Sequence, residues 1–118
     1  MLTRKQVETK VRHWRTRLGL QAWDLKVELA SIGSHSADCQ CDPEYMQAKV
    51  RFDPIKIPLD ELDSYVVHEL LHIYVWPLAH VAETLAGSDP KLLEWCRIQE
   101  ERLVTDLERL VVYSLRQK

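Results

Sequence analysis

Two histidines and a glutamate carry the clearest chemical signal in this chain. The segment VVHELLHIYVW, residues 66–76, contains His68, Glu69 and His72 in the pattern H-E-x-x-H. Two histidines four residues apart on a helix lie on one face, so both rings can reach one ion. The glutamate after the first histidine is placed to take a proton from a water on that ion. The pattern therefore predicts a hydrolytic metal site, with Zn²⁺ as the ion inferred from the ligand types.

The apolar surroundings of the motif favour a metal over a buried helix that merely carries two histidines. Between Val66 and Trp76, His68, Glu69 and His72 are the only strongly polar side chains. A helix this apolar is buried on most faces. Unpartnered imidazoles would each cost roughly 1–3 kcal/mol there, and a buried carboxylate more. A metal ion and its water would supply the missing partners.

A catalytic zinc has three protein ligands and one open position, so a third ligand must come from elsewhere in the chain. The last expected helix offers Glu100 and Glu101. At helical spacing, Glu100 has the apolar neighbours Leu93, Cys96, Leu103, Val104 and Leu107. Glu101 has mostly polar neighbours, so Glu100 points inward and Glu101 mostly to solvent. We predict Glu100 as the third ligand, with Glu101 and a structural salt bridge of Glu100 as the alternatives.

His80 is a weaker candidate for the third ligand. It follows Pro77, which interrupts the helical phase that links it to His72. The extended pattern H-E-x-x-H-x-x-G-x-x-H also fails, since Val75 and Leu78 occupy its glycine and third-histidine positions.

The segments before the motif must fold into the helices and strands that position it. Val7, Val11 and Trp14 recur at helical spacing, which predicts a helix over residues 4–18. Thr3 could cap its start and Gly19 could end it. Alternating apolar and polar residues then predict two strands, which we expect to pair antiparallel. The predicted segments are a strand at 22–30, a loop at 31–44 and a strand at 45–53.

Helices account for the rest of the chain. The motif helix is expected at 60–76, with Asp60 or Asp63 as its cap and Pro77 as its stop or kink. A short helix at 78–86 would end at Gly87. Ser88 or Asp89 before Pro90 marks the start of a long last helix, about 90–115. The pattern predicts a single α+β domain over residues 1–118.

The motifs together resemble a known class. HELLH followed by EERLV on a later helix resembles the gluzincin arrangement of zinc peptidases, and especially short metallopeptidase-like proteins of phages and prophages. The segments DPEYMQAKVRFDP and YVVHELLHIYVWPL are also similar to that group. The resemblance implies a minimal zincin-like fold, zinc ligation by His68, His72 and Glu100, and Glu69 as general base. It also implies a peptide or protein substrate and a phage-encoded protein in a bacterial host.

Large gluzincins also use a tyrosine or histidine to stabilise the oxyanion. The chain has no clear counterpart, and Tyr65, Tyr74 and Tyr113 are candidates that could equally be core aromatics. The strand at 45–53, just before the motif helix, could accept an extended peptide at a sheet edge.

Composition limits the remaining function classes. The net charge is −2, although the first 20 residues carry six basic side chains and one acidic one. This balance does not suggest a dedicated nucleic-acid binder. No apolar run is long enough for a membrane span, and the start MLTRKQVETK has no signal-peptide core. The chain has three cysteines, an odd number. Without an export signal, this number predicts free thiols in a reducing compartment, the cytoplasm.

Cys39 and Cys41 are separated by one residue and could form a second metal loop with His35, although that spacing is poor for zinc.

Two other functions stay open beside peptide hydrolysis. One is a non-catalytic protein that zinc stabilises for binding a partner, and the other is a zinc hydrolase of a non-peptide substrate. The oligomeric state does not follow from the sequence.

Overall fold

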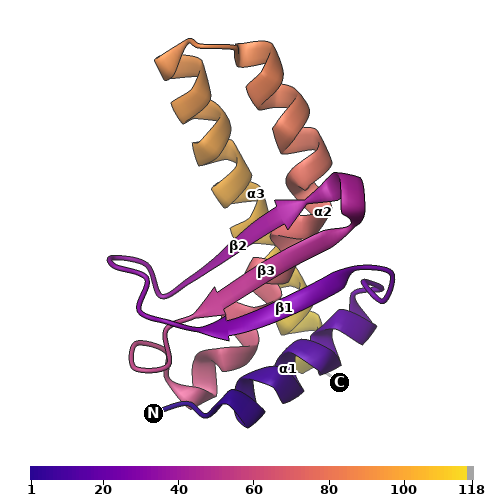
Figure 1. Ribbon diagram of the computed structural model, residues 1–118, viewed down its shortest axis with the longest axis vertical. Helices are drawn as coiled ribbons and strands as arrows, with labels where there is room; N and C mark the ends of the chain where they lie inside the picture. Colours follow the sequence, from indigo (N-terminus) through magenta and orange to yellow (C-terminus); the bar gives the residue numbers. More distant parts are fainter. Residues whose placement is uncertain (117–118) are drawn as a thin grey trace.

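The computed structural model describes residues 1–116, and its first element is the helix α1, Arg4–Arg17 (Figure 1). The hydroxyl of Thr3 accepts a hydrogen bond from the backbone N–H of Gln6 at 3.2 Å, and the Gln6 side chain accepts one from the Thr3 N–H at 2.9 Å. This capping box starts the helix. Gly19 follows the helix with φ +70°, a left-handed conformation that glycine adopts without strain. The helix predicted over 4–18, with both of its end signals, is confirmed.

In the described part of the chain, three strands form one mixed sheet in the order β1-β3-β2. They are β1 (Asp24–Leu29), β2 (Ala37–Asp42) and β3 (Gln47–Phe52). β1 runs parallel to β3, and β2 runs antiparallel to it (Figure 1). The α+β class is confirmed, but the predicted antiparallel pairing of the strands at 22–30 and 45–53 is wrong.

The predicted loop at 31–44 is also wrong, because it contains β2. The side chains that alternate with polar ones in this strand are only Ala37, Cys39 and Cys41, a weak hydrophobic signal. A short connection through the 3₁₀ turn η1, Pro43–Tyr45, leads from β2 into β3 and allows an antiparallel pair. The segment between β1 and β3 is then the long crossover that a parallel pair requires.

β3 is the central strand and has a hydrogen-bonded neighbour on each side. Its backbone groups are therefore already used, and the hypothesis that residues 45–53 accept a peptide is wrong. β2 lies at an edge of the sheet and packs against α2.

The motif lies on α2, which spans Leu62–Ala86 and follows the 3₁₀ turn η2, Leu59–Glu61. The predicted helices at 60–76 and 78–86 are thus one helix, and the prediction that Pro77 stops it is wrong. A proline inside a helix costs about 3 kcal/mol, because it removes one hydrogen bond and clashes with the preceding turn. The contact of α2 with α3, the most extensive between any two elements described, offsets this cost.

Neither cap predicted for the motif helix is present. Glu61 precedes the first turn without a side-chain hydrogen bond to it. Asp63 lies inside the helix and faces α1, where it accepts hydrogen bonds from Lys10 Nζ at 3.1 Å and Trp14 Nε1 at 2.8 Å. Asp63 therefore joins two helices rather than starting one.

The last helix, α3, spans Pro90–Arg116, as predicted for 90–115. The Asp89 carboxylate accepts hydrogen bonds from the N–H groups of Lys91 and Leu92 at 3.0 and 3.3 Å, which caps the helix. α2 and α3 form a hairpin that projects beyond the sheet (Figure 1). The last two residues of the predicted domain 1–118 lie outside the described part.

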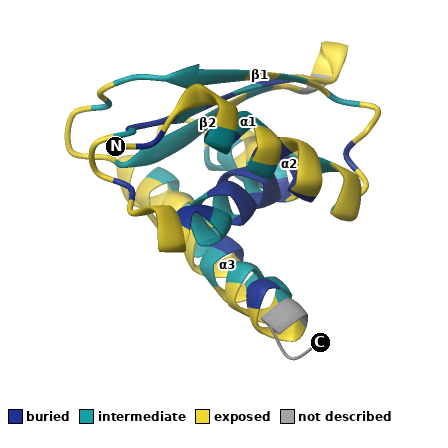
Figure 2. Cartoon of the chain, turned by 90° about the horizontal axis from the view of Figure 1, so that it is seen from below, coloured by how far each residue is buried: buried dark blue, intermediate teal, exposed yellow. Residues whose placement is uncertain are grey.

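The core lies between the sheet and the first half of α2. Val50 and Phe52 of β3 and Val66, Val67 and Leu70 of α2 are fully buried. Figure 2 shows the buried residues concentrated in this half of α2. No residue between 76 and 99 is buried, so the distal hairpin, as we call residues 76–99, contributes no core. Among residues 1–116, no helix is long and apolar enough to cross a membrane.

Candidate metal site

His68 and His72 lie one turn apart on the same face of α2, as their spacing predicts. Their ring centroids are 5.2 Å apart. Both rings are largely buried, with 19% and 13% of the side-chain surface exposed. Both rings face α3, because the hairpin packs these two helices against each other.

The carboxylate of Glu101 on α3 bridges the two histidines. One of its oxygens lies 3.2 Å from Nε2 of His68, and the other lies 3.0 Å from Nε2 of His72. One ligand atom from each of the three residues lies within 4.8 Å of the other two. In the part of the chain that is described, this is the group of three that could hold a metal ion.

Two further glutamates of α3 occupy the opposite nitrogens of the rings. Glu108 Oε1 lies 3.1 Å from Nδ1 of His68, and Glu100 Oε2 lies 2.7 Å from Nδ1 of His72. A histidine that donates its Nδ1–H to a carboxylate keeps the lone pair of Nε2 free for a metal. The outer carboxylates thus orient both rings toward Glu101.

Helical phase predicts the relative burial of Glu100 and Glu101 correctly, whereas the role of Glu100 as the third ligand stays a prediction. The Glu100 side chain is 21% exposed and that of Glu101 is 59% exposed, as the helical phase predicts. Yet Glu101, the more exposed one, meets both Nε2 atoms. The group of His68, His72 and Glu101 therefore lies at the rim of the hairpin contact and not in its interior. Glu100 instead supports His72 from behind.

Glu69 lies beside the histidines and is 6% exposed. Burial raises the pKa of Glu69 to about 7, while the neighbouring His68 and His72 oppose the rise. A carboxyl group with such a pKa can both accept and return a proton near neutral pH. This environment suits the role of general base that the motif predicts.

The histidines and the bridging carboxylate are strongly coupled. Burial lowers the pKa of His72, but hydrogen bonds with Glu101 and Glu100 and the charge of Glu69 raise it overall to about 9. The pKa of His68 is also raised, against the effect of burial. Hydrogen bonds from both histidines hold the pKa of Glu101 well below its ordinary value. A metal ion at the Nε2 atoms would compete with protons, so its binding would release them.

The three potential ligands open into a cleft of about 760 Å³. One wall is the start of β2 with the preceding loop, from Ser34 to Cys39, and the other is formed by α2 and α3. Tyr65 and Arg97 also line it. We call this space the metal cleft. An edge strand along an open cleft leaves room for an extended ligand beside His68, Glu69 and His72.

The other residues that the sequence singled out lie in different places. Of the three candidate tyrosines, Tyr65 lines the metal cleft, whereas Tyr74 and Tyr113 are 50% and 64% exposed on the helices. His80 contacts Trp76 with a centroid distance of 4.8 Å and the rings tilted by 44°, and it does not join the cluster. The sequence did not indicate Glu108 as a site residue. The available signal was its position seven residues after Glu101, which places both on one face of α3.

Cys39 and Cys41 lie on one face of β2, with their Sγ atoms 3.7 Å apart. Cys39 lines the metal cleft beside His35, but the described residues bring no third metal ligand to these thiols. Their Sγ atoms remain separate as free thiols.

Comparisons with known proteins found no matching family model, curated protein or solved structure.

Proposed function

We propose that this protein is a zinc-dependent hydrolase that cleaves peptide bonds. His68 and His72 hold the zinc through Nε2, and Glu101 replaces Glu100 as the third ligand. The observation that carries the proposal is the convergence of two Nε2 atoms and one carboxylate within 4.8 Å, beside a buried Glu69. Two imidazoles and a carboxylate, with a fourth position open, are the donor set of catalytic zinc.

The distances within the cluster fit that donor set. Glu101 oxygens lie 3.0 and 3.2 Å from the two Nε2 atoms. Tetrahedral ligands about 2.0–2.1 Å from zinc are themselves about 3.3 Å apart. The three ligand atoms lie within 4.8 Å of one another, so zinc binding would draw them closer together, while Glu100 and Glu108 support the ring orientations.

When bound, zinc supplies a Lewis acid and lowers the pKa of water toward ~7. Glu69 takes a proton from the attacking water onto its carboxylate and passes it to the leaving amine. Tyr65, the candidate tyrosine that lines the metal cleft, is the residue to donate a hydrogen bond to the oxyanion. Each of these roles belongs to a group already present in the metal cleft.

A peptide bond is the preferred substrate because of the β2 edge. The N-terminal part of β2 lines the metal cleft and ends the sheet on that side. An extended peptide could pair with this edge through main-chain hydrogen bonds and present its carbonyl to the site. This role passes to β2 from the strand at 45–53, and the resemblance to phage metallopeptidase-like proteins supports the same substrate class.

Glu69→Gln tests the proposal directly. We expect the variant to keep zinc and fold but to hydrolyse a peptide library about 10²–10⁴-fold more slowly than the wild type. Glu61→Gln, an exposed glutamate just before α2, is the matched control and should leave the rate unchanged. Zinc content and circular dichroism would be measured on all three proteins. Equal rates for Glu69→Gln and wild type would exclude Glu69 as the base.

A second function is favoured by the position of the ligands. His68 and His72 lie on α2 and Glu101 on α3, so zinc would join two helices whose distal part has no buried residue. In that case zinc is structural and the surface serves a partner. If zinc removal unfolds the chain while neither peptides nor other hydrolysable substrates are cut, this function replaces hydrolysis.

A further inference from the structure

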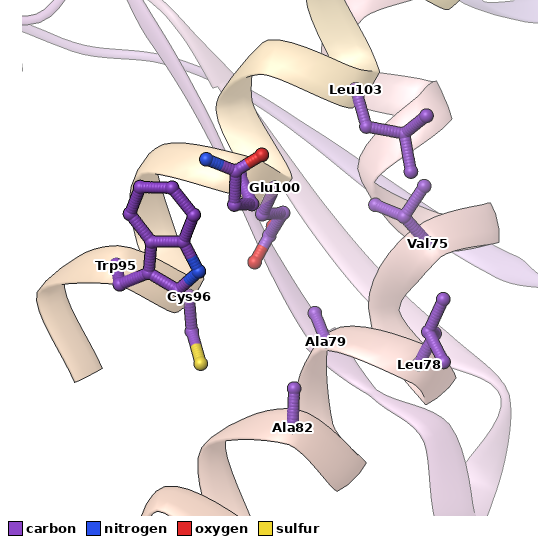
Figure 3. A pocket seen from close by; sticks show the side chains of 9 residues that line it. Val75, Leu78, Ala79, Ala82, Trp95, Cys96, Glu100 and Leu103 are labelled. Atoms are coloured by element: carbon purple, nitrogen blue, oxygen red, sulfur yellow. The ribbon is translucent and has the colours of Figure 1, made fainter. Parts of the chain in front are cut away.

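A second, apolar cavity lies in the hairpin next to the metal cleft. Its volume is about 360 Å³. Side chains from both helices converge on it (Figure 3). They are Leu78, Ala79 and Ala82 of α2 and Trp95, Cys96 and Leu103 of α3. We call this cavity the hairpin pocket.

The hairpin pocket exposes large apolar side chains that packing alone does not explain. Leu78 is 70% exposed and Trp95 is 60% exposed, although both face one cavity. Scattered apolar residues on a surface are ordinary, but a group that lines one cavity marks a binding site. The volume is near the lower end of the range for small-ligand sites, so it suits one large side chain rather than a folded partner.

The hairpin pocket adjoins the metal cleft. Glu100, whose carboxylate contacts His72, lines both cavities. On α2, His72, Val75 and Ala79 follow one another at helical spacing on one face. The pocket therefore begins about one turn beyond the second histidine.

The separation suits a peptide held at the metal. Ala79 is seven residues past His72, which is about 10 Å along the helix axis at about 1.5 Å per residue. An extended peptide advances about 3.3 Å per residue, so about three residues cover the same distance. Side chains near the cleaved bond can thus reach the hairpin pocket.

We infer that the hairpin pocket selects substrates with a large apolar side chain within about three residues of the cleaved bond. The inference rests on the proposed function, because the metal cleft defines where the bond lies. Leu78, Ala79 and Trp95 are then specificity residues, and they contribute to binding rather than to the chemical step.

Short peptide hydroxamates test the inference, because their chelating group anchors them at the metal. Each carries phenylalanine or alanine at one of the three positions nearest that group, and binding to the zinc-loaded chain is measured by calorimetry. At one position, we expect phenylalanine to bind at least about tenfold more tightly than alanine. Cleavage of a peptide library by the same protein should then show large apolar residues at the matching position.

Filling the pocket should remove this preference. In Ala79→Phe, we expect the phenylalanine and alanine probes to bind equally, with the alanine probe as tight as in the wild type. Ala86→Phe, on the same helix but outside the pocket, should keep the preference. Ala82→Leu replaces Ala79→Phe if that variant does not fold, as judged by circular dichroism and zinc content.

Failure of this inference and failure of the proposed function give different results. Equal binding of both probes at all three positions of the wild type would overturn the inference and leave the metal site standing. No binding of any hydroxamate to the zinc-loaded chain would overturn the open zinc position that the proposed hydrolase requires, and the inference with it. Sedimentation velocity supplies one more outcome: a dimer that Ala79→Phe dissociates would make the hairpin pocket a self-association surface and would overturn the inference.

Discussion

At the residue scale, the site depends on which carboxylate faces which ring nitrogen. Glu101 meets Nε2 of both histidines, while Glu100 and Glu108 meet the Nδ1 atoms. The first position suits a ligand and the other two suit groups that orient the rings. Removal of each of the three glutamates should therefore lower the zinc affinity by a different factor.

We expect Glu101→Ala to weaken zinc binding more than Glu100→Ala does. Loss of an outer carboxylate costs about 10–100-fold in metal affinity, and loss of a ligand costs more. Competition with a chromophoric chelator would measure each affinity. Glu94→Ala, an exposed glutamate of α3, is the matched control. Should Glu100→Ala bind zinc more weakly than Glu101→Ala, Glu100 would be the ligand after all.

A second residue-scale prediction concerns Asp63, away from the site. Burial raises the pKa of Asp63, but hydrogen bonds from Trp14 and Lys10 lower it overall. Because the folded pKa lies below the unfolded one, ionised Asp63 stabilises the fold above the unfolded pKa of about 3.9. That stability is lost as the pH falls through the folded pKa.

Asp63→Asn should therefore lower the free energy of unfolding by about 1–2 kcal/mol at pH 7, as expected for a charge-assisted hydrogen bond. The difference from the wild type should shrink below about pH 3.9. Urea unfolding across the pH range would measure it. Asp60→Asn, at an exposed position of η2, should change little. A difference that is as large at pH 2 as at pH 7 would contradict this explanation.

At the element scale, α2 keeps its helical path through Pro77 and so carries both the proposed ligands His68 and His72 and part of the hairpin pocket. The proline lies between His72 and the pocket residues Leu78, Ala79 and Ala82. Its helical cost falls on the turn that begins at Ile73, whose carbonyl lacks the N–H partner four residues later. Removing the proline should thus stabilise the hairpin without disturbing the site.

Pro77→Ala should raise the free energy of unfolding by about 1–3 kcal/mol, since alanine restores a backbone donor and removes a clash. Zinc affinity should stay within about twofold, because α2 already has its helical path through this position. Pro90→Ala is the control: proline at the first position of α3 is well tolerated, so this change should have little effect. A less stable Pro77→Ala protein would mean that the proline positions the hairpin.

At the scale of the whole molecule, the core and the site lie on different sides of the first half of α2, the core toward the sheet and the histidines toward α3. The core fills the space between the sheet and the first half of the helix, while α3 contributes few buried residues, among them Val104 and Val112. The attachment of α3 to α2 therefore depends in good part on the polar cluster of the site. A metal bound there would stabilise the hairpin more than the sheet.

Zinc should raise the melting temperature of the wild type, and a chelator should reverse the rise. At zinc about 1,000 times the dissociation constant, the gain is about 4 kcal/mol. Hydrogen exchange should slow mainly around residues 66–72 and 100–108, with little change in β1. His68→Ala should show neither effect. Protection that rises equally in β1 would point to a global rather than a local role of zinc.

The sequence alone determined the features that depend on local spacing. Thr3 and Gln6 mark the start of α1, and Pro90 marks that of α3, because caps involve residues a few positions apart. His68 and His72 share a face because four residues make about one helical turn. The same H-E-x-x-H pattern places Glu69 beside the two histidines.

Only the tertiary structure decided which distant groups meet. The order of the sheet depended on β2, whose small side chains give a weak strand signal. The continuation of α2 through Pro77 depended on packing against α3, which outweighs local propensity. Glu101 faces the Nε2 atoms, and Glu100 faces a Nδ1 atom, because of the way two helices pack across the hairpin. Periodicity gives the buried side of one helix, but not which of two adjacent carboxylates reaches a ring on another.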